Sequence, residues 1–412
     1  MADAIRIGRR GALAAGLAAG AAATIRPARA APGLVKIAML VPLSGPWARQ
    51  GILERMGAEL AVDDANTAGG IRALGGAKLK LIPYDTGDTA EKARNAAQRM
   101  LAQEPDLVGG FGCWLSSFTL AATEVTERAE LPWLTLSYSD LITGRGFRYV
   151  FQTSPSAVQQ ADDTVPIIMT LAEKATGQRP TKVGVIGDNT AASVSFHKAL
   201  DEHVLREQKL NLVLNETYTA PLSDATTLIR SVRSNRPDFV LLLSTDVPDD
   251  KVLVDKFNEF NLGATRLPQI GNGGHWGTPE VLRVAGADNL QGVMCGLANW
   301  PGKAMDGVSR RFVERTKEPW FGHDSLFGYA HVMILREAVE RAGVAERRKV
   351  ADAIRTLDVR DGPALCFPGH HLTFDANGRR IGAQMVMIQW QNGRPMTVWP
   401  ADVAAAYAIW KA

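Results

Sequence analysis

Short apolar runs alternate with longer amphipathic segments along most of the chain. The run VKIAMLVP at residues 35–42 is continuously apolar, as expected for a strand buried on both faces of a parallel sheet. Helical spacing follows over residues 47–66 and ends at Gly69 and Gly70. The same alternation predicts strands at 78–84, 106–110, 131–137, 182–187, 210–218, 238–244 and 267–271, and helices at 89–103, from about 116, at 191–207, 224–234 and 249–261.

The alternation occurs in two series, and the second series begins after Thr153. Strands that alternate with helices form parallel βαβ sheets, so two series predict two α/β lobes. No linker rich in Pro, Gly or Ser separates the series, which predicts closely coupled lobes. The tail departs from the rhythm, with predicted helices at 306–316, 325–342 and 347–357 and a β-hairpin at 384–399 around an Asn-Gly turn.

The first thirty residues have the features of an export signal. Arg9 and Arg10 precede an apolar run of Gly, Ala and Leu, and residues 28–30 (ARA) form a small-x-small cleavage site. The paired arginines resemble a twin-arginine signal, although ordinary secretion stays open. We expect cleavage after Ala30 and a periplasmic mature protein, the alternative being a leader helix or an uncleaved anchor.

Composition narrows the classes of function. The 412 residues are enough for two domains, and 46% hydrophobic with 22% charged residues is typical of a globular protein. The net charge of +3 comes from the arginines of the leader, so the nearly neutral remainder disfavours nucleic-acid binding. Three cysteines permit one disulfide but no disulfide scaffold, and the histidines lack metal-site spacing. We therefore expect no metal and no cofactor.

Ligands of open α/β sheets bind beyond the carboxyl ends of the strands, which makes those ends the first place to search. The most informative is a glycine-rich turn that runs from Gly109 into Ser116 and Ser117. The helix that follows has no acid in its first turn, so its N-terminus is free to hold an external anion. No phosphate-binding glycine motif is present, which favours a small carboxylate. The alternative is that one serine only caps the helix.

Other residues at strand ends complete the set of candidates. The aromatic residues could form an apolar wall for a ligand or pack between the lobes. The acids could face an ammonium group or stay solvated. The asparagine could only serve a turn. These candidates are Trp47, Trp114, Tyr138, Trp276, Asp140, Asp246 and Asn272. No catalytic constellation emerges. Cys113 is the one candidate nucleophile, and a buried thiol is the alternative reading.

Several segments, taken in order, resemble periplasmic solute-binding proteins for branched-chain amino acids. The opening consists of residues 36–51 (KIAMLVPLSGPWARQG), 57–61 (GAELA) and 66–71 (NTAGGI). The same pattern continues in the turn into Ser116 and Ser117, in 131–137 (LPWLTLS), in 271–274 (GNGG) and in 374–378 (FDANG). The resemblance covers about residues 35–399.

The resemblance implies an α/β fold of type I periplasmic binding proteins. Two Rossmann-like lobes with parallel central sheets would be joined by three crossover segments and would close on a ligand between them. The crossings are expected near Thr153, Gln291 and Gly362, which assigns 31–153 plus 291–362 to lobe 1 and 154–290 plus 363–412 to lobe 2. It also implies delivery of the solute to the permease and ATPase subunits of an ABC transporter. We expect a monomeric, non-enzymatic capture protein.

The family resemblance also implies roles for particular residues. Ser116 or Ser117, followed by Ser137 and Ser139, would hold the carboxylate and ammonium of an amino acid. The aromatic residue common near Gln50 is absent, although Trp47 is close, and Asn189 begins a segment that lacks the usual tyrosine after Asp188. The glycine-rich turn at 271–274 lacks the usual acid, so Asp246 takes the ammonium role or the ligand has no ammonium.

The ligand therefore stays open within the family. A branched-chain amino acid is the default, and aromatic carboxylates, small amides and urea are alternatives. An amide or ester hydrolase that uses Cys113 is the rival from a different class, and a ligand sensor that signals to a receptor is a third possibility.

Overall fold

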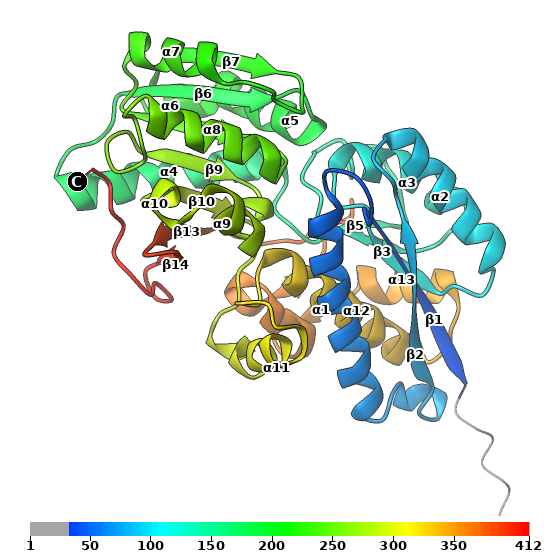
Figure 1. Cartoon of the computed structure of the whole chain (residues 1–412). Coiled ribbons are helices and arrows are strands. Elements are labelled where there is room, and N and C mark those ends of the chain that lie inside the picture. Colours follow the sequence, from blue (N-terminus) through cyan, green and yellow to red (C-terminus); the bar gives the residue numbers. More distant parts are fainter. Residues whose placement is uncertain (1–32, 412) are drawn as a thin grey trace, which may run out of the picture. The chain divides into compact units, whose positions relative to one another are not determined.

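The computed structural model describes residues 33–411. The expected export signal, with its arginine pair and the cleavage site after Ala30, lies outside these residues. Among the described helices, none combines the length and the apolar character that a membrane span needs. The chain forms two α/β units, each built around a largely parallel sheet (Figure 1).

The first sheet has five parallel strands in the order β2-β1-β3-β4-β5. Its strands are β1 (Leu34–Val41), β2 (Lys78–Asp85), β3 (Gly109–Gly112), β4 (Trp133–Thr135) and β5 (Val150–Gln152). The helices that share its core are α1 (Ala48–Thr67), α2 (Ala90–Gln103), α3 (Ser116–Arg128), α11 (Asp306–Thr316), α12 (His323–Ala342) and α13 (Arg347–Arg355). We call this sheet and its helices the first lobe.

The second sheet has seven strands in the order β14-β13-β10-β9-β8-β6-β7. Five are parallel, namely β6 (Lys182–Asp188), β7 (Asn211–Tyr218), β8 (Phe239–Leu243), β9 (Gln269–Asn272) and β10 (Met294–Leu297). The hairpin of β13 (Val386–Gln391) and β14 (Arg394–Trp399) adds two antiparallel strands at one edge. The second lobe also contains α4 (Ala157–Thr176), α5 (Ala191–Ala199), α6 (Leu205–Glu207), α7 (Thr226–Asn235), α8 (Val247–Glu259), α9 (Pro279–Ala285) and α10 (Ala287–Leu290).

Short elements complete the description of residues 33–411. A small antiparallel pair joins β11 (Asp358–Val359) to β12 (Leu372–Thr373). The single-turn helices are η1 (Arg72–Leu74), η2 (Leu200–Val204, a π-helix), η3 (Gly274–Gly277), η4 (Lys303–Met305), η5 (Gly362–Cys366) and η6 (Pro368–His370).

Each sheet has its own hydrophobic core. One cluster of buried side chains surrounds the first sheet, and two clusters cover the two faces of the second sheet. The first core includes residues from Val35 to Phe151 and again from Ala298 to Phe374. The chain therefore passes between the cores after β5, after β10, and between Phe374 and Met385. The crossing expected near Gln291 lies instead after β10, and the crossing expected near Gly362 lies instead between Phe374 and Met385. Both therefore occur later in the chain than predicted.

Helices α1 and α12 lie side by side in the first lobe and touch through their backbones (Figure 1). A Cβ on Gly57 would lie 1.8 Å from the carbonyl oxygen of Ser325, and a Cβ on Gly328 would lie 2.0 Å from that of Glu54. Only glycine permits this approach, because any side chain would overlap a main-chain atom of the facing helix. The contact fixes the start of α12 relative to α1.

Candidate functional site

The turn between β3 and α3 holds two non-glycine residues in the left-handed region of backbone conformation. Cys113 has φ 70° and Trp114 has φ 51°, values that L-residues with large side chains rarely adopt. The indole N–H of Trp114 donates to Asp324 Oδ1 at 2.8 Å, and the Trp114 carbonyl accepts from the hydroxyl of Ser137 at 2.7 Å. Strain of this kind persists where the surroundings hold it in place, and it often marks a functional site.

Ser116 opens α3 but does not cap it. The N-cap residue is Leu115, and among the described residues no side chain caps the first turn, which contains no acid. The Ser116 hydroxyl oxygen instead accepts the backbone N–H groups of Tyr138 and Ser139, each at 3.1 Å. Because two donors occupy its oxygen, Ser116 has its own proton left to donate to something else.

A pocket of about 40 Å³ lies in front of this turn. Both lobes supply its walls, and we call it the interlobe pocket. Its lining residues are Trp114, Leu115, Ser116, Leu136, Tyr138, Thr190, Ala192, Ser193, Phe196, Leu243, Ser244, Thr245, Asn272, Gly273, Gly274 and His275. The mixture of apolar side chains with a few hydroxyls is typical of small-molecule sites.

The interlobe pocket brings together four residues that the sequence singled out, namely Trp114, Ser116, Tyr138 and Asn272. Asn272 is held by a bond from its Nδ2 to Gln160 Oε1 at 2.9 Å. Tyr138 shares a hydrogen bond with His323 Nε2 at 3.0 Å, and burial raises the pKa of its phenol. The rule of strand ends therefore located one wall of the site.

Ser137, Ser139 and Ser117 lie next to this wall without lining it. Ser137 is buried, and its hydroxyl bonds to the Trp114 carbonyl and to Thr119 Oγ1. The Ser139 hydroxyl lies 3.1 Å from that of Ser195. Ser117 is half-buried on the next position of α3.

The candidate polar residues Asp140, Asn189 and Asp246 also lie outside the lining. Asp140 accepts the N–H of Val158 at 3.0 Å and pairs with Arg379 at 3.4 Å. Asn189 is exposed. Asp246 caps α8 by accepting the N–H of Asp249 at 2.8 Å, and burial together with the Asp249 charge raises its pKa to about 7. The ammonium role suggested for Asp246 therefore has no support in its position.

Three further candidates pack elsewhere. Trp47 stands edge-on to Phe118, with ring centroids 5.5 Å apart. Gln50 is fully buried beside a separate surface hollow, and its amide has no hydrogen-bond partner among the described residues. Trp276 is also fully buried, below Gly271 in the second core.

The second-lobe wall contains most of the residues that the sequence did not reveal. Ser244 and Thr245 follow β8, while Thr190, Ala192 and Ser193 form the start of α5. His275 closes the wall beside Trp114, with ring centroids 6.2 Å apart. The Asp250 carboxylate, 3.4 Å from His275 Nε2, raises the pKa of the imidazole against the effect of burial. The signal for Ser244 and Thr245 was their place at a strand end.

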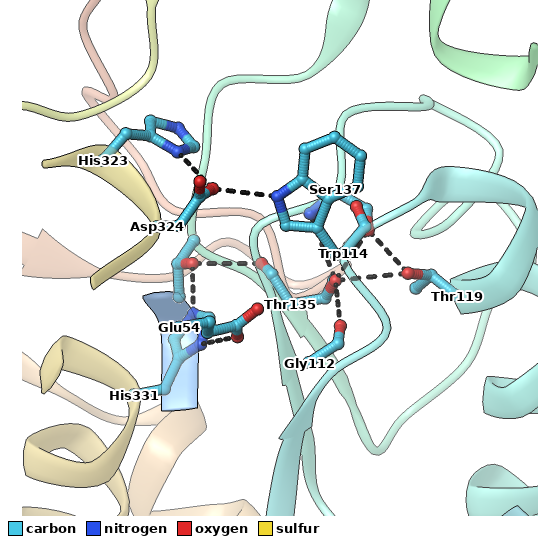
Figure 2. A network of polar contacts seen from close by, with 10 residues as sticks. Glu54, Gly112, Trp114, Thr119, Thr135, Ser137, His323, Asp324 and His331 are labelled. Atoms are coloured by element: carbon cyan, nitrogen blue, oxygen red, sulfur yellow. Dashed lines mark hydrogen bonds and ion pairs between the residues drawn. The ribbon is translucent and has the colours of Figure 1, made fainter. Parts of the chain in front are cut away.

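A buried polar network supports the first-lobe wall from behind (Figure 2). Thr135 bonds to the Gly112 carbonyl at 3.0 Å, and Asp324 accepts from both Trp114 and His323. Deeper in the network, Glu54 lies 3.9 Å from His331 Nδ1. Burial raises the pKa of Glu54 well above its ordinary value, and it lowers that of His331 to about 3, so the imidazole is neutral near pH 7.

The cysteines do not form a reactive or bonded set within residues 33–411. Cys113, Cys295 and Cys366 are free and buried, and burial raises the pKa of each thiol. A thiol that stays protonated is a poor nucleophile, which argues against a hydrolase based on Cys113. In the same described range, no cluster of three or more His, Cys, Asp or Glu side chains could hold a metal ion.

Comparison with known proteins shows similarity along nearly the whole described chain. A family model described as periplasmic binding protein matches residues 34–395. The Leu/Ile/Val-binding protein homolog 8 of Brucella melitensis is 31% identical over 390 residues, covering 90% of this chain and 92% of that protein. Homolog 7 of the same organism is 29% identical over 407 residues, covering 95% and 98%.

Solved structures show the same fold at lower identity. A branched-chain amino acid transporter substrate-binding protein from Streptococcus pneumoniae, in complex with isoleucine, matches with a TM-score of 0.75 and 19% identity, covering 88% of this chain and 97% of that one. A solute-binding protein from R. palustris, in complex with benzoate, matches with a TM-score of 0.72 and 17% identity, covering 89% and 96%. The expected two-lobed α/β fold is thereby confirmed.

Proposed function

Since the chain belongs to the periplasmic binding protein family, we propose that it captures a small solute in the interlobe pocket and delivers it to an ABC transporter. The family consists of binding proteins rather than enzymes. Capture needs a site that both lobes share, because a ligand stabilises the closed arrangement only by contacting both of them.

The observation that carries this proposal is the composition of the interlobe pocket. Trp114, Ser116 and Tyr138 come from the first lobe, whereas Ser193, Thr245 and others come from the second. Within residues 33–411 no side chain caps the first N–H groups of α3, and Ser116 offers a proton, which together suit a carboxylate or carbonyl oxygen. The indole, the phenol and the side chain of Phe196 provide an apolar surface for the rest of the solute.

A branched-chain amino acid is the first ligand to test. The relatives from Brucella are named for Leu, Ile and Val, and one structural neighbour holds isoleucine. Another neighbour holds benzoate, which makes aromatic carboxylates and small amides the second class of candidates.

The location and partners follow from the same assignment. We propose that residues 1–30 direct export and are removed after Ala30, which leaves a monomeric protein in the periplasm. Its partners are the permease and ATPase subunits of the transporter.

Calorimetric titration of the purified protein tests this function. The panel contains branched-chain amino acids, aromatic carboxylates, small amides and urea. One class should bind with saturable 1:1 stoichiometry. At 100 times its dissociation constant, such a ligand should add about 2.7 kcal/mol to the free energy of unfolding and so raise the melting temperature. If no compound binds, or if a bound compound is turned over, the capture function is wrong.

A further inference from the structure

The hydroxyl groups on the two walls of the interlobe pocket have opposite hydrogen-bonding character. On the first-lobe wall, the oxygen of Ser116 is occupied by two backbone N–H donors, so the group it presents is its proton. The N–H groups of the first turn of α3 add further donors, since the first bond within this helix is from Thr119 N to Leu115 O. This wall is therefore a donor surface.

Three hydroxyls of the second-lobe wall are arranged in the opposite way. Their protons are all donated into the protein: Ser193 to the Leu243 carbonyl at 2.9 Å, Ser244 to Asp250 Oδ1 at 2.6 Å, and Thr245 to Asp188 Oδ2 at 2.6 Å. A hydroxyl has one proton and two lone pairs, so each of these groups has only acceptor capacity left. These three hydroxyls therefore offer acceptors on the second-lobe wall, beside the N–H groups at the start of α5.

The carboxyl groups behind the walls have the same asymmetry. Asp188 and Asp250 are almost fully buried directly behind Thr245 and Ser244. Asp188 also accepts the N–H of Thr190 at 2.9 Å, which places a carboxyl group beside the N-terminus of α5 and offsets the positive end of that helix. Neither α3 nor α5 has an acid in its first turn, so the carboxyl group of Asp188 is what distinguishes the two helix starts. Among the described lining residues, none is Asp, Glu, Lys or Arg.

We propose that the hydroxyls of Ser244 and Thr245, oriented by Asp250 and Asp188, hold the N–H end of the bound solute. The site then takes molecules of zero net charge that carry a carboxylate or carbonyl oxygen at one end and an ammonium or amide N–H at the other. This inference rests on the proposed capture function and assigns the ammonium role to hydroxyls backed by acids. No acid needs to stand in the pocket itself, which agrees with the glycines at Gly273 and Gly274 and with the capping role of Asp246.

Matched ligands test the inference by calorimetry. L-leucine and 4-methylpentanoate share the same apolar body and carboxylate and differ in the ammonium group, while 4-methylpentanamide supplies a neutral N–H donor. We expect leucine or the amide to bind at least tenfold more tightly than 4-methylpentanoate, and their order identifies the ammonium or the amide as the group held. If 4-methylpentanoate binds as tightly as both, the inference is overturned while capture stands. If nothing in the wider panel binds, the capture function itself fails.

Variants of Thr245 locate the effect. Thr245→Val keeps the shape of the side chain and removes the acceptor, so the ligand with the N–H group should lose at least tenfold in affinity while 4-methylpentanoate is unchanged. Thr245→Ser keeps the hydroxyl and should retain binding within about threefold, which separates loss of the acceptor from a folding defect. Ser234→Ala is the control, because Ser234 is exposed on α7 and lies outside the lining. Equal losses for both ligands in Thr245→Val would overturn the assignment.

Discussion

The indole N–H of Trp114 donates to the carboxylate of Asp324 at 2.8 Å, across 210 positions of sequence. The neighbouring His323 bonds to the hydroxyl of Tyr138 at 3.0 Å and to the same Asp324 oxygen at 3.1 Å. Two consecutive residues at the start of α12 thus hold both aromatic side chains of the first-lobe wall. The orientation of this wall depends on a helix that lies far along the chain (Figure 2).

Removal of the Asp324 acceptor should weaken ligand binding. In Asp324→Ala, the indole loses its partner and its fixed orientation, and we expect about a tenfold loss of affinity, in line with the ~1.5 kcal/mol of a hydrogen bond to a charged group. Asp324→Asn keeps an acceptor oxygen and should stay within about threefold of the parent. Titration calorimetry measures both; equal affinities of the alanine variant and the parent would show that the wall does not need this bond.

The two serines at the start of α3 should behave differently. Ser116→Ala removes a proton donor from the interlobe pocket, so we expect about a tenfold loss of affinity for a carboxylate ligand. Ser117→Ala is the matched control on the next position, which does not line the pocket, and should change affinity by less than about twofold. A larger loss in Ser117→Ala than in Ser116→Ala would contradict the geometry.

The buried Asp246 should make stability depend on pH. Its folded-state pKa is raised to about 7, so folding takes up a proton between pH 4 and 7. This contribution to stability is present below the ordinary pKa of an aspartate and is lost as pH rises to 7. Asp246→Asn keeps an N-cap residue and should flatten that decline.

Urea unfolding at intervals from pH 4.5 to 7.5 measures the slope. Asp352→Asn provides the control, since Asp352 is exposed on α13. The same slope in Asp246→Asn and the parent would show that another group takes up the proton.

The contact between α1 and α12 should not tolerate a methyl group. In Gly328→Ala, the new Cβ would lie 2.0 Å from the Glu54 carbonyl oxygen, which is main chain and cannot move aside. We expect a loss of at least about 2 kcal/mol in the free energy of unfolding. Gly307→Ala in α11 is the control, because its Cβ meets nothing within 4 Å and a better helix former should add about 0.5–1 kcal/mol. Denaturant titration distinguishes the two.

The three thiols should resist modification in the folded protein. Each is buried and has a raised pKa, so the reactive thiolate is scarce. A chromogenic disulfide reagent should report no thiols under native conditions and three in denaturant. Rapid native reaction at Cys113 would revive the nucleophile hypothesis.

Sequence patterns were informative where hydrophobic periodicity was strong. The run at 35–42 corresponds to β1, and the Asn-Gly hairpin corresponds to β13 and β14. The predicted strand at 106–110 overlaps β3 only at Gly109 and Gly110 and ends two residues too early. Three of the four residues of β3 are glycines, which carry no strand signal. No strand was predicted at β10 (MCGL), which lacks β-branched residues.

The sequence predicted only part of the candidate site. Strand ends located Trp114, Ser116 and Tyr138, since the carboxyl ends of parallel strands meet at one edge. Sequence cannot show which neighbour a hydroxyl bonds to, so Thr245 went unnoticed beside the more conspicuous Asp246. The carboxylate of Asp246 caps α8 and so does not face the ligand. Only the tertiary structure shows which of these two roles the side chain takes.

Because of the glycine contact between α1 and α12, the two walls of the interlobe pocket differ in how well they tolerate substitutions. The first-lobe wall is attached through His323 and Asp324 to a helix whose backbone is pressed against its neighbour, so changes there endanger the fold before they alter specificity. Thr245 stands in the turn after β8, where the half-buried side chain can be exchanged with less effect on a core. Attempts to retarget this protein to new solutes should therefore start from the second lobe and leave the α1–α12 pair untouched.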